Sequence, residues 1–585
     1  MRRVLAGCAL ALAVAWPGAA RAAVDRPSAW EVLESRVVAA VAAANPVDAT
    51  QFGLHRYDTR LPDYSSTGVR RTVQRLQGLL REVRAFPTAK LTRETLLDRS
   101  LLVRELESRI RYRDVERLWQ KSPYFYAGIL SSGIQYLVIN HHASADTLAA
   151  ALSARLEGFP RLLEQATANI HQPPRLLCQA CAQTLHVMPE MYRSALPAAC
   201  KGASPGSLRR LDAAIATAAD GISAYLEGLG ELEEEHGTDD YPLGQKHYDW
   251  RLRQVEGLDL TGEQLARQGD AWLADVEADI AKLTDARKAA GIADAPVGPT
   301  PQDFSREQIL ESFVASIDSA KRYVRERDLV TIPANLGPLV PTPTPPDMRP
   351  IVPGMAMLPP ATFDTSTAGT YFLGGAFPDS LTASNRDRFY ARMARHEMLG
   401  GSVHEGIPGH HLQLSIAKGR NSFTRRFVNS TTMVEGWAFY CEELMARAGF
   451  YGPDSLVYLQ RVLPGIRFRA TRVVIDARVH TGKMTYEQAV RFMRDHNPQM
   501  DSARASGEVL RYVTEPTQAM SYLVGKSLIV GLRAEVERRE GAKFHLKSFH
   551  DRFLGYGSIP VPWIARDWIG SVPAIGRYRL ARMTP

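Results

Sequence analysis

The sequence has no run of lysine and arginine, although its 585 residues carry a formal net charge of +8. The basic residues are spread evenly and are not interleaved with aromatic ones, whereas nucleic-acid-binding proteins gather them on one face. We therefore expect no nucleic-acid partner. Three of the surplus arginines, Arg2, Arg3 and Arg21, also lie in an N-terminal segment that we expect to be removed.

The sequence also lacks an apolar stretch of the roughly 20 residues that a membrane-spanning helix needs. Its N-terminal apolar segment, Val4 to Trp16, follows two arginines and precedes Ala20-Arg21-Ala22, an order typical of a cleaved signal peptide. We predict a signal peptide over residues 1–22 and a periplasmic or secreted protein without stable membrane insertion. A lipoprotein anchored at Cys8 is the less favoured alternative, because most of the apolar segment follows Cys8.

Cysteine is scarce, with 5 residues in the whole chain. Cys178 and Cys181 form one CxxC, which no second CxxC and no histidine pair at zinc-finger spacing accompanies. In an oxidising compartment we expect a disulfide among Cys178, Cys181 and Cys200, with the pairing left open. Cys441 is expected to be a buried free thiol.

What the sequence contains is a globular composition with long helical patterns. Its 45% hydrophobic and 23% charged residues exclude collagen, a coiled-coil rod and wholesale disorder. Residues 23–330 form an N-terminal helical region, and capping boxes at Thr261 and Thr485 predict helix starts. Ten prolines then lie between Thr331 and Pro360, where we expect a packed, extended segment instead of a flexible linker.

This proline-rich segment leads to residues 368–373, the clearest strand candidate, which ends at two glycines. Helical patterns return beyond Arg386. The residues therefore predict a mainly α protein with one small patch of strands. The second region, residues 331–585, holds the most unusual motif of the chain, and we expect the two regions to intertwine in one fold.

That motif places three histidines and one glutamate around two glycines and a proline, over Val403-His-Glu-Gly-Ile-Pro-Gly-His-His411. Glycine and proline inside a helix cost about 1 and about 3 kcal/mol, so a packed helix does not account for them. On an unbroken helix His404 and His410 would point about 120° apart, and His411 would lie about 10 Å from His404. A backbone break at Gly406–Gly409 would let two imidazoles meet on a metal ion. A structural turn with solvated histidines is the alternative.

A third metal ligand should be acidic and come from another helix. Glu435 lies in an otherwise apolar stretch, where an unpaired carboxylate is costly and a metal ion would resolve the cost. A salt-bridged glutamate at a helix start is the alternative. Glu442, seven residues later on the same helical face, is either a rival ligand or a partner that holds a ligating histidine.

These residues resemble the signature of a bacterial family catalogued as a domain of unknown function. The resemblance rests on His-Glu-Gly-x-Pro-Gly-His-His, on the following Glu-Gly-Trp-Ala-x-Tyr-x-Glu, and on residues 512–525 and 549–550. That family is similar in turn to the thimet oligopeptidase, angiotensin-converting enzyme and carboxypeptidase Taq group of zinc peptidases. The resemblance covers most of the mature chain. It implies a large, helical, two-lobed, zincin-like body with a central channel and a small antiparallel sheet beside the zinc helix.

The resemblance also implies one Zn²⁺ per chain, held by His404, His410 and Glu435. Two extra residues separate Glu405 from the Gly-His pair, which leaves His411 as a rival second ligand, although the Gly-His match favours His410. Glu405 would be the general base.

Two tyrosines ten residues apart, Tyr512 and Tyr522, match the oxyanion donors of those peptidases. Packing with a solvated hydroxyl is the alternative for both tyrosines. A further implication is that the substrate backbone adds to an edge strand, a place matched by Gly369, Thr370 and Tyr371.

Arg472, Asp476 and His480 recur every four residues as a polar stripe on one predicted helix. Surface ion pairing is the plain interpretation. In the alternative, Arg472 and His480 contact substrate, and Asp476 supports the site from behind, as do Glu442 and His411.

The sequence therefore predicts an exported zinc metallopeptidase, a hydrolase that cleaves short peptides with a metal-activated water. One alternative is a zinc hydrolase for another amide, such as a peptidoglycan stem or an acylated small molecule. The other is a non-catalytic envelope protein that binds zinc or peptide. Glu405 favours an enzyme, because a binding protein has no need of a carboxylate next to a ligand.

Overall fold

A computed structural model describes residues 27–140, 143–289, 306–344, 355–374, 398–451 and 455–576. The predicted signal peptide and Cys8 lie outside the described residues. Most of the described chain is helical, which confirms the predicted mainly α class. Among the described helices, none combines the length and the apolar character that crossing a bilayer takes.

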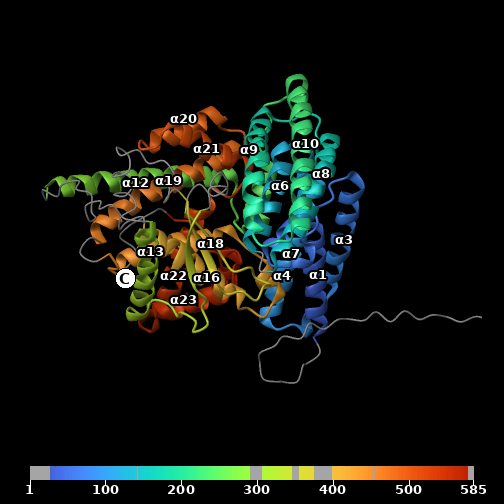
Figure 1. Cartoon of the computed structure of the whole chain (residues 1–585). Coiled ribbons are helices and arrows are strands. Elements are labelled where there is room, and N and C mark those ends of the chain that lie inside the picture. The colour runs from blue at the N-terminus through green and yellow to red at the C-terminus, as the bar shows by residue number, and fades with distance from the viewer. Residues whose placement is uncertain are drawn as a thin grey trace, which may run out of the picture.

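The N-terminal lobe is an upright helical bundle, seen on the right of Figure 1. Five of its helices begin at Ser28, Ser65, Thr92, Ser144 and Ser204, whose hydroxyls each accept an N–H of the first turn. Its helices are α1 (Ala29–Ala44), α2 (Pro46–Gln51), α3 (Ser66–Ala85), α4 (Arg93–Arg111), α5 (Leu118–Lys121), α6 (Pro123–Asn140), α7 (Ala145–Glu157), α8 (Phe159–Asn169), α9 (Arg175–Ala199) and α10 (Pro205–His236).

The second lobe packs around a separate core that includes Trp272, Trp437, Phe439 and Leu528. The capping boxes predicted at Thr261 and Thr485 are both present. Its helices are α11 (Gln245–Trp250), α12 (Gly262–Ala289), α13 (Arg306–Glu326), α15 (Met398–Gly401), α16 (His410–Lys418), α17 (Phe423–Phe427), α18 (Thr431–Arg447), α19 (Ser455–His480), α20 (Tyr486–His496), α21 (Ser502–Thr514), α22 (Ser521–Glu540), α23 (Leu546–Gly555) and α24 (Val561–Ile569).

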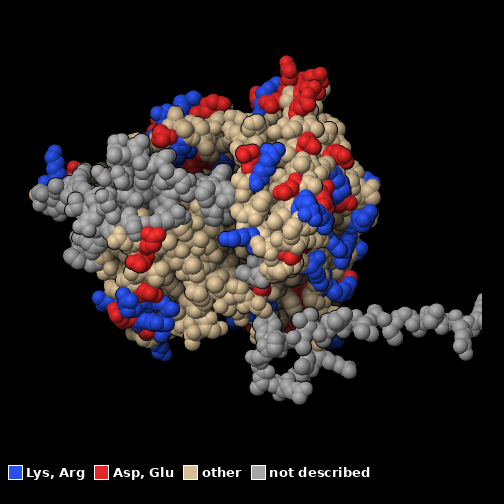
Figure 2. All heavy atoms as spheres, viewed as in Figure 1, with Lys and Arg blue, Asp and Glu red and all other residues tan. Residues whose placement is uncertain are grey.

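Because α12 packs along α19 and α13 contacts the π-helical segment η7 (Ser402–Gly406), residues of the predicted N-terminal region belong to the second lobe. Figure 2 shows that basic and acidic side chains intermingle over the N-terminal lobe on the face in view. The acidic end of α10 stands out at its top, with Glu231, Glu233, Glu234 and Glu235 near the helix C-terminus.

Three short strands form a sheet with the order β1-β3-β2: β1 (Leu339–Pro343), β2 (Met355–Leu358) and β3 (Gly369–Leu373). The predicted strand at 368–373 is confirmed as β3. β1 pairs with β3 in parallel and β2 pairs with β3 antiparallel, so the sheet is mixed and the expected antiparallel sheet is wrong. Pro341 and Pro343 lie on β1, an edge strand, where a missing N–H is tolerated.

The predicted disulfide is wrong, because Cys178, Cys181 and Cys200 are all free, buried thiols. Cys178 and Cys181 lie near the start of α9, and Cys200 follows its end. About 30 Å of helix therefore separates Cys200 from Cys178 and Cys181, far beyond the Cα separation of a disulfide. Burial raises the pKa of the Cys178 thiol to about 12. Cys441 is a buried free thiol, as expected.

Candidate metal centre

The helix breaks where the glycines and proline of the motif predicted it. η7 ends at Gly406, and α16 begins at His410. Gly409 is required in between, because a Cβ there would lie 2.0 Å from the carbonyl oxygen of His404. Trp437 of α18 donates its ring N–H to the Pro408 carbonyl at 2.8 Å, which ties the loop to the neighbouring helix. The break turns His404 and His410 toward each other, with ring centroids 4.7 Å apart.

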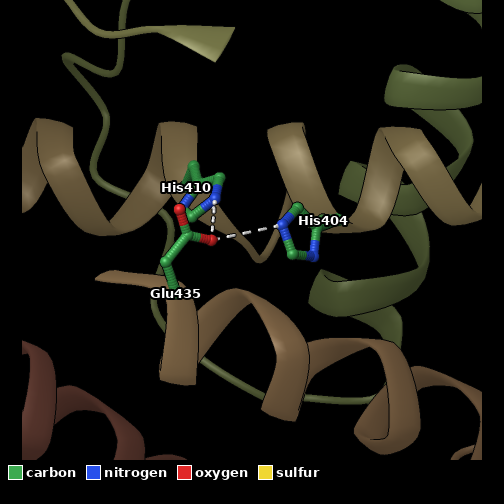
Figure 3. A group of neighbouring side chains, drawn as sticks. All are labelled: His404, His410 and Glu435. Atoms are coloured by element: carbon green, nitrogen blue, oxygen red, sulfur yellow. Dashed lines mark ion pairs between the residues drawn. The ribbon is translucent and has the colours of Figure 1, made fainter. Parts of the chain in front are cut away.

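Glu435 reaches these two histidines from α18 (Figure 3). Its Oε2 lies 3.7 Å from Nε2 of His404 and 3.4 Å from Nε2 of His410. All three ligand atoms lie within 4.8 Å of one another. The two N–O distances are too long for hydrogen bonds, but two ligands of one tetrahedral zinc ion lie about 3.3 Å apart when each bond is about 2.05 Å. The three residues therefore fit a zinc ion.

Glu442 orients His404 from behind. Its Oε1 accepts from Nδ1 of His404 at 2.7 Å, so Nε2 is the ring nitrogen that faces Glu435. Glu435 and Glu442 are seven residues apart on α18, which puts both carboxylates on one face of the helix. Burial lowers the pKa of His404, but the two carboxylates outweigh it and raise the pKa to about 10. Burial raises the pKa of Glu435, but His410 and His404 lower it overall.

Glu405 lies beside the cluster and contacts the sheet. Its Oε2 accepts the backbone N–H of Met357, on β2, at 3.1 Å. Burial raises the pKa of Glu405, and the nearby His404 and His410 offset only part of that effect. The carboxylate of Glu405 is thus held near His404 and His410 by a backbone N–H of the sheet.

Tyr522 approaches Glu435 because α18 and α22 cross at two glycines. A Cβ on Gly436 would lie 2.6 Å from the Cα of Gly525, so neither position has room for a side chain. After burial, the negative charge of Glu435 is the largest contribution that raises the pKa of Tyr522. Arg472 covers the ring of Tyr522 at 4.2 Å from its centroid. Arg472 thus touches a residue of the site, and its predicted contact with substrate stays a prediction.

Tyr512 does not join the site. Its hydroxyl donates to Glu508 at 2.7 Å, and its side chain is buried against Arg472. The hydroxyl is directed to Glu508, so the structure does not support the predicted oxyanion donor at this position. Thr517, with φ of 74°, lies in the turn between the helices that carry the two tyrosines.

His480 and Asp476 are also placed differently from the prediction. His480 is fully buried; its Nε2 donates to the Tyr512 carbonyl at 2.9 Å, and its Nδ1 accepts the Leu243 N–H at 3.4 Å. Both ring nitrogens are thus engaged by backbone, and His480 is not available to substrate. Asp476 accepts the N–H groups of Thr517 and Met520, each at 3.1 Å, and supports the turn before α22 instead of a metal ligand.

His411 is directed away from the cluster, and its Nε2 donates to the Gly337 carbonyl, next to β1, at 2.8 Å. His410 therefore joins His404 and Glu435, and His411 does not.

The proposed strand addition at Gly369, Thr370 and Tyr371 is wrong, because β3 is the central strand and pairs with β1 and β2 on its two sides. β2, whose Met357 N–H donates to Glu405, is an edge strand of the described sheet.

A cavity of about 630 Å³ lies between the lobes, in the place of the expected channel. Thr431 lines it one helical turn before Glu435, and Gln518 lines it from the turn before α22, four residues before Tyr522. The Gln518 amide nitrogen is 3.5 Å from the Tyr522 hydroxyl. The cavity was not predicted from the sequence. The N-terminal lobe contributes α6 to its wall, and the one sequence signal for this was the four-residue spacing of Tyr124, Gly128, Ser132 and Tyr136.

Comparisons with known proteins agree with this fold. The profile of a family described as "Bacterial protein of unknown function (DUF885)" matches residues 46–567. A candidate lipoprotein of unknown function from Shewanella oneidensis has a similar structure at a TM-score of 0.74 and 21% identity, over 92% of this chain and 99% of its own. A candidate lipoprotein from Colwellia psychrerythraea reaches a TM-score of 0.76 at 18% identity, over 92% of this chain and 97% of its own.

At these identities the similarity shows the fold alone. An M32 carboxypeptidase from Deinococcus radiodurans aligns over 86% of this chain and 96% of its own, at 14% identity and a TM-score of 0.37, which is too low to support an argument. No curated protein matches the chain.

Proposed function

Since this chain belongs to the bacterial DUF885 family, whose function is unknown, we propose a function from the geometry of the cluster: an exported zinc metallopeptidase. The observation that carries the proposal is the convergence of His404, His410 and Glu435 with Glu405 beside them. Three protein ligands are typical of catalytic zinc, whereas structural sites are closed by four. Zinc bound there would polarise a substrate carbonyl and make water nucleophilic near neutral pH.

The chain's own residues then handle the proton and the developing charge. Glu405, held by the Met357 N–H, takes the proton of the attacking water and delivers it to the leaving amine. The Tyr522 hydroxyl donates a hydrogen bond to the carbonyl oxygen as negative charge develops on it. Glu442 keeps the ring of His404 in one orientation.

Export is part of the proposal. It is supported by the N-terminal sequence and by the description of two similar structures as candidate lipoproteins. Intact mass of the envelope-purified protein should correspond to a chain that starts at Ala23 without lipid. A lipid-modified chain that starts at Cys8 would contradict cleavage after Ala22 and leave export itself standing.

The test of the activity is zinc analysis together with peptide hydrolysis. We expect about one zinc per chain in the wild type, and Glu405→Gln should keep that zinc. Its kcat should fall by roughly 10²–10⁴-fold, because a general base of this kind contributes that factor. Hydrolysis unaffected by Glu405→Gln would contradict the mechanism. Hydrolysis of peptidoglycan stems or acylated small molecules but of no linear peptide would favour a zinc hydrolase of another amide.

A further inference from the structure

One face of α6 borders the cavity between the lobes. Tyr124, Gly128, Ser132 and Tyr136 recur every four residues, and all line the cavity between the lobes. Residues four apart lie on one face of a helix. Phe125 and Ile129 widen this face on one side. We call the stripe from Tyr124 to Tyr136 the α6 face.

Gly128 leaves open space in the middle of the α6 face. A Cβ built at this position would meet no atom within 4 Å. Glycine inside a helix lowers its stability by about 1 kcal/mol relative to alanine, and no close packing accounts for Gly128. A group of a ligand can occupy this space between the two tyrosines.

The opposite wall of the cavity belongs to the second lobe and leads to the metal cluster. It is formed by residues 429–431 at the start of α18 and by residues 514 and 516–518 before α22. Thr431 precedes Glu435 by one turn, about 6 Å along α18. Gln518 contacts Tyr522. The wall that faces α6 across the cavity therefore lies next to the cluster, one turn of helix from Glu435 and one side chain from Tyr522.

Three of the four arginines that line the cavity, Arg104, Arg109 and Arg251, pair with carboxylates. Arg109 pairs with Glu105 at 2.6 Å and Arg251 pairs with Glu116 at 2.6 Å. Arg113 donates to the Asn45 side-chain oxygen at 2.6 Å. A ligand would therefore be held by aromatic contact and neutral hydrogen bonds, which suits a polypeptide with aromatic or aliphatic side chains better than a strongly charged ligand.

We propose that the α6 face binds the part of a peptide substrate that lies remote from the cleaved bond; this inference rests on the proposed function. From Tyr124 to Tyr136, α6 rises about 18 Å. An extended peptide covers this length with about five residues at about 3.3 Å each. The enzyme therefore selects peptides that extend about five residues beyond the metal cluster and carry an aromatic or aliphatic side chain there.

Binding to the zinc-containing Glu405→Gln protein tests this proposal, because that variant should hold peptides without cleaving them. Gly128→Leu fills the space on the α6 face, and leucine is a better helix former than glycine. Gly228→Leu on α10 is the matched control, since a Cβ there also meets nothing within 4 Å and the residue is exposed outside the cavity. The probes are a fluorescein-labelled heptapeptide with central phenylalanines and a matched tripeptide.

The heptapeptide should bind at least ten-fold more tightly than the tripeptide, and Gly128→Leu should reduce this ratio to below two-fold, with Gly228→Leu leaving it unchanged. A ratio unchanged by Gly128→Leu, or a heptapeptide that binds no better than the tripeptide, would overturn the proposal. Displacement of the heptapeptide by a peptide-free peptidoglycan glycan fragment would assign the face to sugar and overturn it as well.

Cleavage of the tripeptide by the wild type tests the proposed function separately. If the wild type cleaves neither probe and the heptapeptide still depends on Gly128, then the catalytic proposal fails and the binding site stands.

Discussion

The buried and partly buried histidines of the second lobe have two kinds of surroundings. In the metal cluster, Nε2 of His404 and of His410 both face one carboxylate oxygen of Glu435 across more than hydrogen-bond distance. At His480 and His550, every ring nitrogen already has a hydrogen-bond partner. His550 donates to the Leu329 carbonyl at 2.6 Å, and its other nitrogen lies 2.8 Å from the Tyr440 hydroxyl.

The difference teaches that burial does not identify a metal ligand. A buried histidine that donates from one ring nitrogen and accepts at the other is neutral, and its single lone pair is already engaged, so it does not bind an ion. A histidine whose nitrogen faces a carboxylate beyond hydrogen-bond reach, with another carboxylate behind it, has the surroundings of a zinc ligand. The following predictions test this distinction.

Replacement of one histidine of each kind should have the largest and most contrasting effects. His410→Ala should lose the bound zinc and all detectable peptide hydrolysis, because two protein ligands do not hold a catalytic zinc. His480→Ala should keep the zinc, but its free energy of unfolding should fall by about 3 kcal/mol, since two buried backbone groups lose their partners. Zinc content and urea unfolding of both variants separate the two roles. Equal zinc loss in both would break the comparison.

Glu442→Ala should weaken zinc binding by about 10–100-fold, because it removes the carboxylate that holds the ring of His404. Competition with a zinc chelator measures the affinity. Glu443→Ala is not a suitable control because Glu443 pairs with the buried Lys526; Glu540→Ala, at the exposed end of α22, is suitable. Zinc affinity unchanged in Glu442→Ala would remove Glu442 from the account.

The neutral histidines should also be visible in the pH dependence of stability. Burial lowers the pKa of His550 from 6.5 to about 3 and that of His480 from 6.5 to about 4. Since the folded-state pKa lies below the unfolded one, the stabilisation is complete above about pH 6.5 and is lost as pH falls toward 4. Each histidine contributes a slope of about 1.4 kcal/mol per pH unit in this window.

Urea unfolding of the metal-free protein between about pH 4 and pH 7 measures this slope. In His550→Phe the slope should be smaller than in the wild type by the contribution of one histidine. The comparison is made on slopes, so the loss of packing at this position does not affect it. An unchanged slope would mean that His550 is charged in the folded state.

Local chemistry made part of this molecule predictable from the sequence. Thr261 and Thr485 begin helices because their hydroxyls and the glutamines three residues later satisfy free N–H groups within one turn. Gly406 to Gly409 predicted the break that joins the two histidines, because helix breakers act on their own backbone. Glu435 was predictable from the cost of a carboxylate among apolar neighbours.

The features that depend on distant contacts were not predictable. His410 and His411 are neighbours in one motif, and only the fold determines that the first faces a carboxylate and the second a backbone carbonyl. The parallel pairing of β1 with β3 and the central position of β3 depend on chain connections that the strand pattern does not encode. Glu508, which accepts the Tyr512 hydroxyl, lies only four residues away in the sequence. The direction of that hydroxyl depends on how α21 packs.

Anomalous diffraction at the zinc edge, from crystals of the protein purified without added chelator, tests the central claim most directly. The account predicts one peak per chain, within about 2.2 Å of Nε2 of His404, Nε2 of His410 and a carboxylate oxygen of Glu435. A peak elsewhere in the molecule, or none at this position in crystals soaked with zinc, would contradict it.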